Sequence, residues 1–248
     1  MARERNVILA SLFALAGGAW ALLLWQSTTG DEQAMGLTMG MGAYLFLANW
    51  VAMMVAVMFP TAAPMVLMFA RVHAGKRQQG QAFVPTWVFI SSYLAVWAAV
   101  GVLLFGAAVA AERLGEQSTW LTNNAARFGG GVLVLAGLYQ LSPLKRSCLA
   151  KCRTPLGFIL GSWRDGYGGA FRMGLEHGVY CLGCCWLLFV ILFPLGVMNV
   201  AAMALIAALI FAEKSMTIGQ QVAKVAAAGL MAYGLLVAFV PAALLTTI

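Results

Sequence analysis

Charged side chains are scarce in this chain: aspartate, glutamate, lysine and arginine make up 9% of its 248 residues, whereas 62% are hydrophobic. This composition excludes an ordinary soluble globular domain, in which roughly 25% of the residues are charged. Long apolar runs recur along the whole length, and no boundary between domains is visible. The sequence therefore predicts an all-α fold, a polytopic bundle of transmembrane helices that forms one domain over residues 1–248.

Two motif classes are also missing. No G-x-x-x-x-G-K-[ST] pattern occurs, so the chain has no nucleotide-binding loop that could drive active transport. Histidine is nearly absent, since His73 and His177 are the only two, which excludes a haem bound between histidines on opposite sides of a membrane. The net charge of +7 comes from basic residues that flank apolar runs, so nucleic acid is not an expected partner.

Seven apolar stretches are long enough to cross a bilayer if short or tilted spans are allowed, and six to eight spans are compatible with the pattern. The first follows Arg3 and Arg5 like a signal peptide, but its apolar run is long and no clean cleavage site follows, so we predict a retained span. The fifth and sixth are so close that they are equally compatible with one tight helical hairpin. The predicted spans are 7–25, 43–70, 84–110, 125–142, 173–194, 197–213 and 222–243.

The basic residues predict the orientation of the bundle. With the N-terminus in the cytoplasm, 13 of the 15 lysines and arginines fall on the cytoplasmic side and 2 on the outer side. The long basic connection 143–172 then lies at the cytoplasmic surface. Its stretch "PLGFILGSW" is too short to span, so we expect it to lie in the membrane interface or to re-enter beside the bundle.

Three of the five cysteines lie within the segment "HGVYCLGCCW" in the fifth span. Helical spacing places Met173, His177, Cys181 and Cys184 on one face, with Cys185 at its edge. A single cysteine in a membrane helix is usually a packing residue, but three in line with a histidine and a methionine predict a metal site. The spacing matches no standard zinc motif. The predicted cytoplasmic or membrane location makes a disulfide framework unlikely to form.

The other two cysteines, Cys148 and Cys152, are spaced to face one way on a short helix of the basic connection. The basic residues around them would favour the thiolate form, which binds metals. An inert surface pair is the alternative interpretation. Because they directly precede the fifth span, we predict that they form a second binding site, through which the same metal enters or leaves. The neighbouring basic residues are Lys145, Arg146, Lys151 and Arg153.

Methionine is abundant, with fourteen residues, among them "MGLTMGMG" at 35–42 and a series in the second span. Thiolate and thioether ligands select Cu(I), so copper is the favoured ion and zinc the less favoured one. From the outside inward the ligand types would pass from methionines to histidine and cysteines, as in copper uptake channels. Packing of methionine in a core is the alternative. The candidate ligands in the second span are Met53, Met54 and Met58.

Several polar residues in the spans are candidates for a supporting role, because polar groups in a membrane are often functional. Glu176 adjoins His177 and would be its hydrogen-bond partner. Asn199 and Glu213 share one face of the sixth span, and Asn49 lies beside the methionines of the second. For the two glutamates, pairing with Arg172 or Lys214 at the membrane surface is the alternative.

Four motifs in this order, "NWVAMMVAVMFPTAAPM", "YQLSPLKRSCLAKCRTP", "GLEHGVYCLGCCW" and "MNVAAMALIAALIFAEK", give the chain a family resemblance over roughly residues 40–215. It resembles an uncharacterised bacterial family of predicted metal-binding integral membrane proteins, the domain of unknown function 2182. The resemblance implies a multi-pass protein of the bacterial inner membrane and names no substrate. It supports as site residues Asn49, Met53, Met54, Met58, Pro60, Pro64, Cys148, Cys152, His177, Cys181, Cys184, Cys185, Asn199, Met203 and Glu213.

Three functions remain open from the sequence. The first is Cu(I) binding for transport or for delivery to a cuproenzyme or a copper chaperone. The second is a membrane oxidoreductase that uses a copper centre or the dithiols themselves, with Cys148 and Cys152 as a thiol pair. The third is an accessory or structural subunit of an oligomer or a larger membrane complex, docked through glycine-rich faces such as 129–131.

Overall fold

In the computed structural model, residues 2–29, 37–38, 40–79, 83–196, 199–240 and 243 are described, and all regular structure within them is helical. The expectation of an all-α fold is therefore confirmed for this part of the chain. The helices are α1 (Ala2–Thr29), α2 (Ala43–Gln78), α3 (Thr86–Gln117), α4 (Thr119–Asn123), α5 (Ala125–Gln140), α6 (Pro143–Arg153), α7 (Pro155–Ser162), α8 (Gly166–Val190), α9 (Leu192–Leu195), α10 (Val200–Ser215) and α11 (Gly219–Phe239).

Five helices are long and apolar enough to cross a membrane: α1, α2, α3, α8 continued by α9, and α11. Two further predicted spans coincide with α5 and α10, which have 16 residues each. A helix of that length is about 24 Å long, shorter than a hydrocarbon core of about 30 Å. The presence of several candidate spans is thus confirmed, whereas the total of seven spans stays a prediction.

The fifth and sixth predicted spans form two separate helical segments joined by a short turn. The chain leaves α9 at Leu195 and turns through Gly196, whose φ of +93° is in the left-handed region that glycine adopts most readily. Asn199 then caps α10, because its side-chain oxygen accepts a hydrogen bond from Ala202 N at 2.9 Å.

The central helix of the bundle is α2. Of its most apolar window, 61% is buried inside the structure, against 17% for the corresponding windows of α1 and α3. Apolar residues on all sides of α2 explain this burial, because a helix that is hydrophobic all round is stable only when other helices surround it. The helix continues through Pro60 and Pro64. Four methionines of α2, Met53, Met54, Met58 and Met65, therefore lie in the core, whereas Met68 is half-buried.

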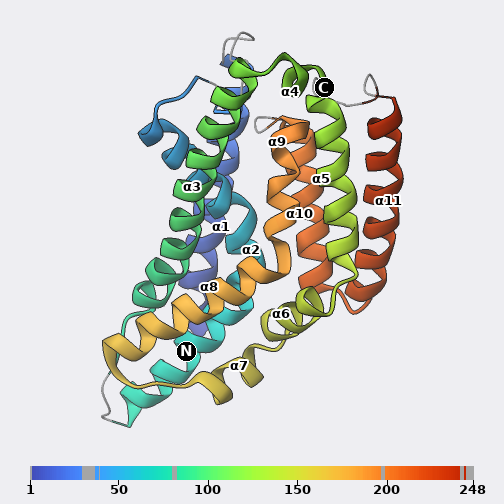
Figure 1. Ribbon diagram of the computed structural model, residues 1–248. Coiled ribbons are helices and arrows are strands. Elements are labelled where there is room, and N and C mark those ends of the chain that lie inside the picture. The colour runs from blue at the N-terminus through green and yellow to red at the C-terminus, as the bar shows by residue number, and fades with distance from the viewer. Residues whose placement is uncertain are drawn as a thin grey trace.

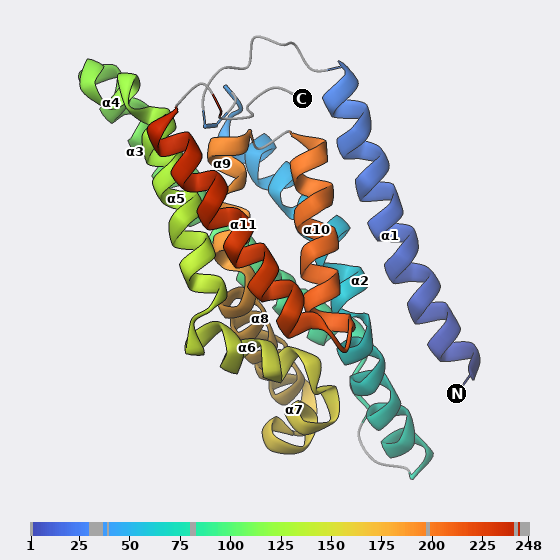
Figure 2. The same ribbon diagram turned by 90° about the vertical axis from the view of Figure 1, so that its right-hand side faces the viewer.

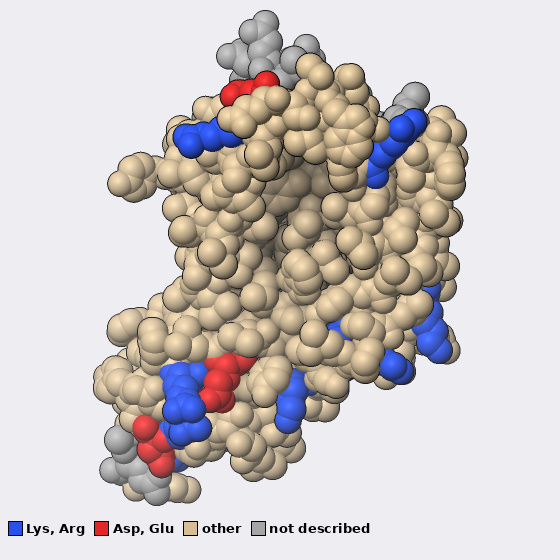
Figure 3. Space-filling view, in the orientation of Figure 1, with Lys and Arg blue, Asp and Glu red and all other residues tan. Residues whose placement is uncertain are grey.

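Helices α5 and α11 run side by side in both views of the molecule, and α6 and α7 lie at the lower end of the bundle, where α7 contacts α2 (Figures 1 and 2). On the face shown in Figure 3, most lysines and arginines gather at this lower end, and a broad band of uncharged surface separates them from a few at the upper end. The basic residues thus gather at one end of the bundle, and the assignment of this end to the cytoplasmic side stays a prediction.

Two glycines let α3 approach α8 closely, as their spacing predicts. A Cβ atom on Gly174 would lie 1.9 Å from Ser92 Oγ and 2.4 Å from Phe89 O, and one on Gly178 would lie 2.7 Å from Val96 Cγ2. The small-xxx-small pair of α8 therefore forms the contact with α3. This contact brings Tyr93 of α3 against the cysteine face of α8.

A second close approach joins α5 to α11 and gives a test of the packing. We expect Gly130→Ala to lower stability by about 1–3 kcal/mol, as overpacking does. The reason is that its Cβ would lie 2.7 Å from Gly234 O and 2.8 Å from Ala238 N, both backbone atoms. The measurement is the thermal unfolding of the purified protein in detergent.

Gly131→Ala is the matched control, because a Cβ at that position meets no atom within 4 Å. It should leave stability unchanged or raise it slightly, since alanine favours a helix over glycine by about 1 kcal/mol. Equal effects of the two substitutions would contradict the close approach of α5 and α11.

Candidate metal centre

The residues of the predicted metal-binding face of α8 are all buried. Met173 is 0% exposed, His177 3%, Cys181 1%, Cys184 1% and Cys185 2%. The face points into the bundle because α8 is covered by α3 on one side and by α6 on another. The helical spacing of these residues in the sequence therefore predicted which face of α8 is buried.

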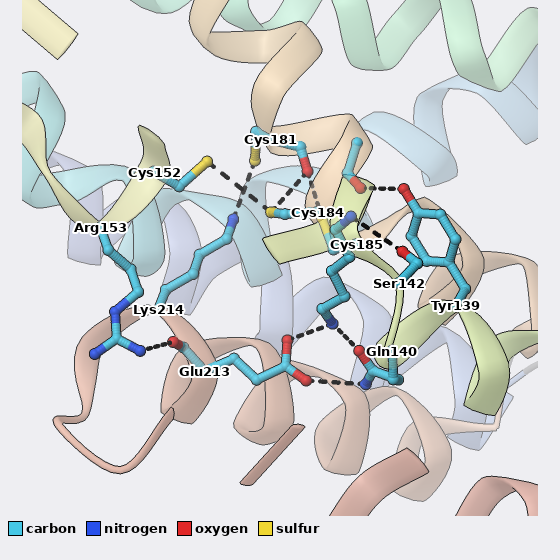
Figure 4. Close-up of polar contacts among 12 residues, drawn as sticks. Tyr139, Gln140, Ser142, Cys152, Arg153, Cys181, Cys184, Cys185, Glu213 and Lys214 are labelled. Atoms are coloured by element: carbon cyan, nitrogen blue, oxygen red, sulfur yellow. Dashed lines mark hydrogen bonds and ion pairs between the residues drawn. The ribbon is translucent and has the colours of Figure 1, made fainter. Parts of the chain in front are cut away.

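Three thiols from two separate segments come together at this face. The sulfur atoms of Cys152 on α6 and of Cys181 and Cys184 on α8 all lie within 4.8 Å of one another, and Cys152 Sγ is 3.9 Å from Cys184 Sγ (Figure 4). Sulfurs that bind one ion at about 2.3 Å lie roughly 4 Å apart, so the three thiols could share one soft metal ion. We call these three residues the thiol cluster.

Three further helices, α2, α3 and α10, contribute to the environment of the thiol cluster. Met58 Sδ of α2 lies 3.7 Å from Cys181 Sγ, and the Tyr93 hydroxyl forms a 3.1 Å hydrogen bond with the same sulfur. Lys214 at the end of α10 donates a hydrogen bond to Cys181 Sγ at 3.1 Å (Figure 4). Its Nζ also lies 3.7 Å from Met58 Sδ. A thioether and one ammonium group thus border the three thiols.

The remaining two cysteines lie beside the thiol cluster without belonging to it. Cys185 turns back on its own helix and donates a hydrogen bond to Cys181 O at 2.8 Å. Cys148 packs against α8 at Gly183, where a Cβ would lie 2.6 Å from Cys148 Sγ. Cys148 and Cys152 do face one way on α6, as their spacing predicts, but only Cys152 reaches the sulfurs of α8.

The expectation that neighbouring basic residues keep Cys148 and Cys152 as thiolates is wrong. Hydrogen bonds that Cys152 donates to Cys181 and Cys184, together with burial, raise the pKa of the Cys152 thiol well above its ordinary value. Burial and the nearby Cys184 raise the pKa of the Cys148 thiol. Metal binding by Cys152 therefore has to release a proton, because the thiolate is the ligand.

His177 lies outside the thiol cluster. Among the described residues, the group of ligand atoms within 4.8 Å of one another contains no histidine and no carboxylate. The imidazole is surrounded instead by aromatic rings, with centroids 5.9 Å from Phe89, 5.5 Å from Tyr93 and 5.5 Å from Phe158. Its Nδ1 atom is buried and has no hydrogen-bond partner in the described part of the chain.

The candidate ligands of α2 lie at different levels along that helix. Met54 is fully buried one turn before Met58, and Met53, 3% exposed, precedes it. Asn49 lies nine residues before Met58, about 13 Å along the helix axis. Met58 contacts the thiol cluster through Cys181 Sγ. Of the outer segment 35–42, Met35 and Met39 lie outside the described residues, and Met41 packs against the core.

Glu213 has a structural partner that the sequence did not indicate. Its carboxylate forms a buried ion pair with Lys145 Nζ at 2.6 Å, and Gln140 Nε2 donates to it at 2.9 Å. Lys145 also donates to the side-chain oxygen of Gln140 (Figure 4). The alternative considered for Glu213, a pairing with Lys214 at the membrane surface, is therefore wrong. Lys145, Glu213 and Gln140 form a polar clamp that joins α5, α6 and α10.

The polar clamp is extended by Arg153, the residue after Cys152. Its guanidinium donates hydrogen bonds to Glu213 O at 3.1 Å and to Met216 O at 2.7 Å. These carbonyls belong to the C-terminal turn of α10, where backbone acceptors lack helical partners. The contacts fix the C-terminal end of α6 to α10, and so they hold Cys152 and Lys214 on opposite sides of the same site.

The other two polar candidates have local roles. Glu176 forms an ion pair with Arg172 Nε at 3.1 Å and lies 3.9 Å from Arg164 NH2, which corresponds to the surface pairing considered as the alternative. A role as hydrogen-bond partner of His177 has no support in these contacts. Asn199 caps α10 through Ala202 N and donates to Leu195 O at 3.3 Å.

Sequence reasoning did not select Lys214 and Tyr93 as site residues. Lys214 was assigned to the basic residues of the cytoplasmic surface, and Tyr93 lies in an apolar span without any motif. A signal for Lys214 was present, because it follows Glu213 at the end of an otherwise apolar run. No sequence signal could have placed its ammonium group near Cys181, which is 33 residues away along the chain.

Comparison with protein families adds one finding to this geometry. A family model described as PpoB2, copper chaperone, matches residues 47–237. The chain belongs to this family. The match includes the whole thiol cluster together with Met58 and Lys214, and it supports the resemblance to a metal-handling family, whereas the name domain of unknown function 2182 stays a prediction. Neither the curated proteins nor the solved structures include a match to the chain.

Membership in this copper-related family and the geometry of the thiol cluster are mutually consistent. Three sulfurs within 4.8 Å of one another, from the half-buried Cys152 and the buried Cys181 and Cys184, form a set of ligands that is compatible with copper binding. Soft thiolate ligands suit Cu(I) and zinc, while hard cations prefer oxygen. Among the described residues no carboxylate belongs to this group of ligand atoms, and that of Glu213 is engaged by Lys145 and Gln140.

Proposed function

We propose that this protein is a multi-pass protein of the bacterial inner membrane that binds Cu(I) and delivers it to a cuproenzyme or carries it across the membrane. The observation that carries the proposal is the convergence of Cys152, Cys181 and Cys184, with all three sulfurs within 4.8 Å of one another. Membership in a family described as copper chaperone supports copper as the cargo.

The donor set favours Cu(I) over zinc. Three sulfurs are sufficient for Cu(I), whereas structural zinc sites have four protein ligands in tetrahedral geometry. A further sulfur beside the cluster belongs to Met58, 3.7 Å from Cys181 Sγ, and a thioether is a ligand for Cu(I) and not for zinc. No carboxylate or imidazole nitrogen of the described residues completes the group.

Lys214 provides the charge that a buried copper site needs. Cu(I) bound by three thiolates carries an excess of negative charge, which is costly inside a protein unless a cation compensates for part of it. The ammonium group of Lys214 lies 3.1 Å from Cys181 Sγ and can compensate for one thiolate without binding the metal. A protonated lysine has no lone pair, so it acts as a counter-ion and a hydrogen-bond donor.

Buried methionines suggest the route by which copper reaches the thiol cluster. Met54 lies one helical turn before Met58 on α2 and both are 0% exposed. Thiolates bind Cu(I) more tightly than thioethers, so transfer from Met54 past Met58 to Cys181 proceeds towards stronger ligands. In the predicted orientation this direction is inward, from the outer half of the membrane to the cytoplasmic half.

The test of the proposal is a Cu(I) titration of the anaerobically purified protein against a chromogenic Cu(I) chelator, with zinc as the competing ion. We expect near-stoichiometric binding, and X-ray absorption with sulfur neighbours at about 2.3 Å. Uptake of copper into proteoliposomes then distinguishes transport from delivery. Failure to bind Cu(I), or coordination by nitrogen and oxygen alone, would contradict the proposal.

A dithiol oxidoreductase is the second candidate, and one observation favours it. Cys152 Sγ and Cys184 Sγ are 3.9 Å apart, close enough for oxidation to a disulfide after a small movement. The sequence-based version of this idea paired Cys148 with Cys152, but the nearest sulfur to Cys152 comes from α8. A redox function predicts turnover of a quinone or a protein disulfide without added metal, which the copper-binding proposal does not.

We expect Lys214→Met to weaken Cu(I) binding by about 10- to 100-fold, the equivalent of one lost hydrogen bond to a charged group. The substitution keeps the length and the apolar stem of the side chain but removes the ammonium group next to Cys181. The measurement is competition with the same chelator at fixed pH.

Lys224→Met is the matched control, since Lys224 is exposed on α11 and its loss changes the net charge equally. It should bind Cu(I) as the native chain does. Tighter binding by the Lys214→Met variant would show that the ammonium group blocks the site, which is the opposite of the role assigned to it.

A further inference from the structure

A groove lies between the first turns of α1 and the lower half of α2, at the end of the molecule where the basic residues gather. Its volume is about 700 Å³. In Figures 1 and 2 the start of α1 runs beside this part of α2, and the segment before α3 closes one side. The groove is separate from the thiol cluster, and none of its lining residues belongs to the candidate metal centre.

Three arginines line this groove: Arg3 and Arg5 from α1 and Arg71 from α2. All three are exposed, and no ion pair among the described residues involves any of them. Glu4 also lines the groove, and Arg5 Nε donates a hydrogen bond to Asn6 Oδ1 at 3.4 Å. The groove therefore holds an excess of positive charge that the described part of the chain does not neutralise.

The walls next to these arginines are apolar. Val7 and Ile8 on α1 face Leu67 and Met68 on α2, and Phe83 closes the end near α3. Val7 is 57% exposed and Phe83 41% exposed, so exposed apolar side chains lie beside the arginines of the groove. The combination of clustered arginines and exposed apolar walls is complementary to an amphiphile with an anionic head.

We propose that this groove binds an anionic phospholipid of the cytoplasmic leaflet, with the phosphate at Arg3, Arg5 and Arg71. The acyl chains would extend along the apolar residues of α1 and α2. The proposal rests on the membrane location in the proposed function, and it does not depend on copper. Basic pockets between membrane helices on the cytoplasmic side bind the headgroups of anionic lipids in this way.

Two features favour a lipid over a free phosphate ion as the occupant. A soluble anion would gain no binding free energy from the apolar side chains of Val7, Leu67 and Phe83. The acyl chains of a lipid would cover these side chains and remove them from water. The volume of about 700 Å³ is also far larger than one phosphate ion needs. The arginines come from two helices more than 60 residues apart in sequence and line one groove. The groove therefore differs from a basic tail, which binds a charged membrane surface without forming a site.

Native mass spectrometry of the full chain in detergent tests the proposal. Phosphatidylglycerol and phosphatidylcholine with identical acyl chains are added in turn, and inorganic phosphate is added as a competitor. We expect the native chain to retain phosphatidylglycerol preferentially. Each arginine near an anionic lipid contributes about 5-fold in affinity, so changing all three arginines to glutamine should lower the preference on the order of 100-fold.

A second triple variant controls for the change in charge. Arg146→Gln, Lys151→Gln and Lys224→Gln remove the same number of charges from exposed positions outside the groove, and this variant should keep the preference. Equal retention of both lipids by the native chain, equal loss in both triple variants, or displacement of the lipid by millimolar phosphate would each overturn the proposal. Copper binding is measured on the same samples, so a failure of the lipid site is distinguishable from a failure of the copper site.

Discussion

The variant with both Cys181→Ser and Cys184→Ser is expected to bind Cu(I) roughly 10,000-fold more weakly than the native protein. The estimate follows from structural zinc sites, whose four ligands together supply about 10–16 kcal/mol, so that two soft ligands correspond to about 6 kcal/mol. Both sulfurs lie within 4.8 Å of Cys152 Sγ, and a serine hydroxyl is a poor ligand for Cu(I).

The measurement is elemental analysis of the anaerobically purified variant, followed by competition with the Cu(I) chelator. Copper should be near-stoichiometric in the native chain and absent from the variant. Serine has nearly the shape of cysteine, and the far-ultraviolet circular dichroism of the variant should match that of the native protein. An unfolded variant would therefore be recognised before its copper content is interpreted.

Cys185→Ser is a closely matched control, because it makes the same substitution at the residue next to Cys184. Cys185 is as buried as the cluster residues, but its thiol donates to the backbone at Cys181 O and does not reach Cys152. We expect this variant, and also Cys148→Ser, to retain copper. If Cys185→Ser lost copper while Cys184→Ser kept it, the ligand set assigned here would be wrong.

The second large effect concerns stability. We expect Glu213→Ala to lower the free energy of unfolding by about 3–5 kcal/mol, the usual cost of removing one partner of a buried ion pair. Lys145 and Glu213 are both 1% exposed, so truncation of Glu213 leaves the ammonium group of Lys145 buried with only Gln140 as a partner. Thermal unfolding in detergent, followed by circular dichroism, measures the effect.

Two further variants test whether the unpaired charge or the lost packing causes this decrease in stability. The double variant Glu213→Leu with Lys145→Met removes both charges and should recover most of the stability, because an apolar pair of similar volume often replaces a buried ion pair without loss. Glu176→Ala breaks the more exposed ion pair with Arg172 and should cost less than about 1 kcal/mol. A double variant as unstable as Glu213→Ala would show that packing, and not the unpaired charge, causes the effect.

The polar clamp also connects stability with copper binding. Arg153 is adjacent to Cys152 and donates to Glu213 O and Met216 O, so α6 is fixed to α10 on both sides of the candidate site. Glu213→Ala keeps these backbone acceptors but removes the ion pair of the carboxylate with Lys145 on α6, and this loss should loosen the position of Cys152 relative to Cys181 and Cys184. In the proposed copper site, Glu213 is a positioning residue that does not bind the metal.

The sequence by itself determined the class of fold and the buried face of α8. Apolar runs of about 20 residues predict membrane helices because the backbone of such segments must satisfy its own hydrogen bonds. Helical spacing placed His177, Cys181 and Cys184 on one face, and the structure buries that face. Gly174 and Gly178 have the small-xxx-small spacing that favours the close approach of another helix, and the structure shows that this helix is α3. Each of these inferences depends on residues within one helix, where geometry is fixed by local hydrogen bonds.

Only the tertiary structure decided which of the candidate residues meet. Cys152 joins Cys181 and Cys184, whereas Cys148, four residues earlier, packs against Gly183. Lys145 pairs with Glu213 across 68 residues, and Lys214 reaches Cys181 across 33. Such contacts depend on how α6 and α10 dock on α8, and no periodicity in the sequence encodes that docking. The reason is physical: the spacing of residues along a helix is set by the backbone, but the distance between helices is set by the packing of all their side chains.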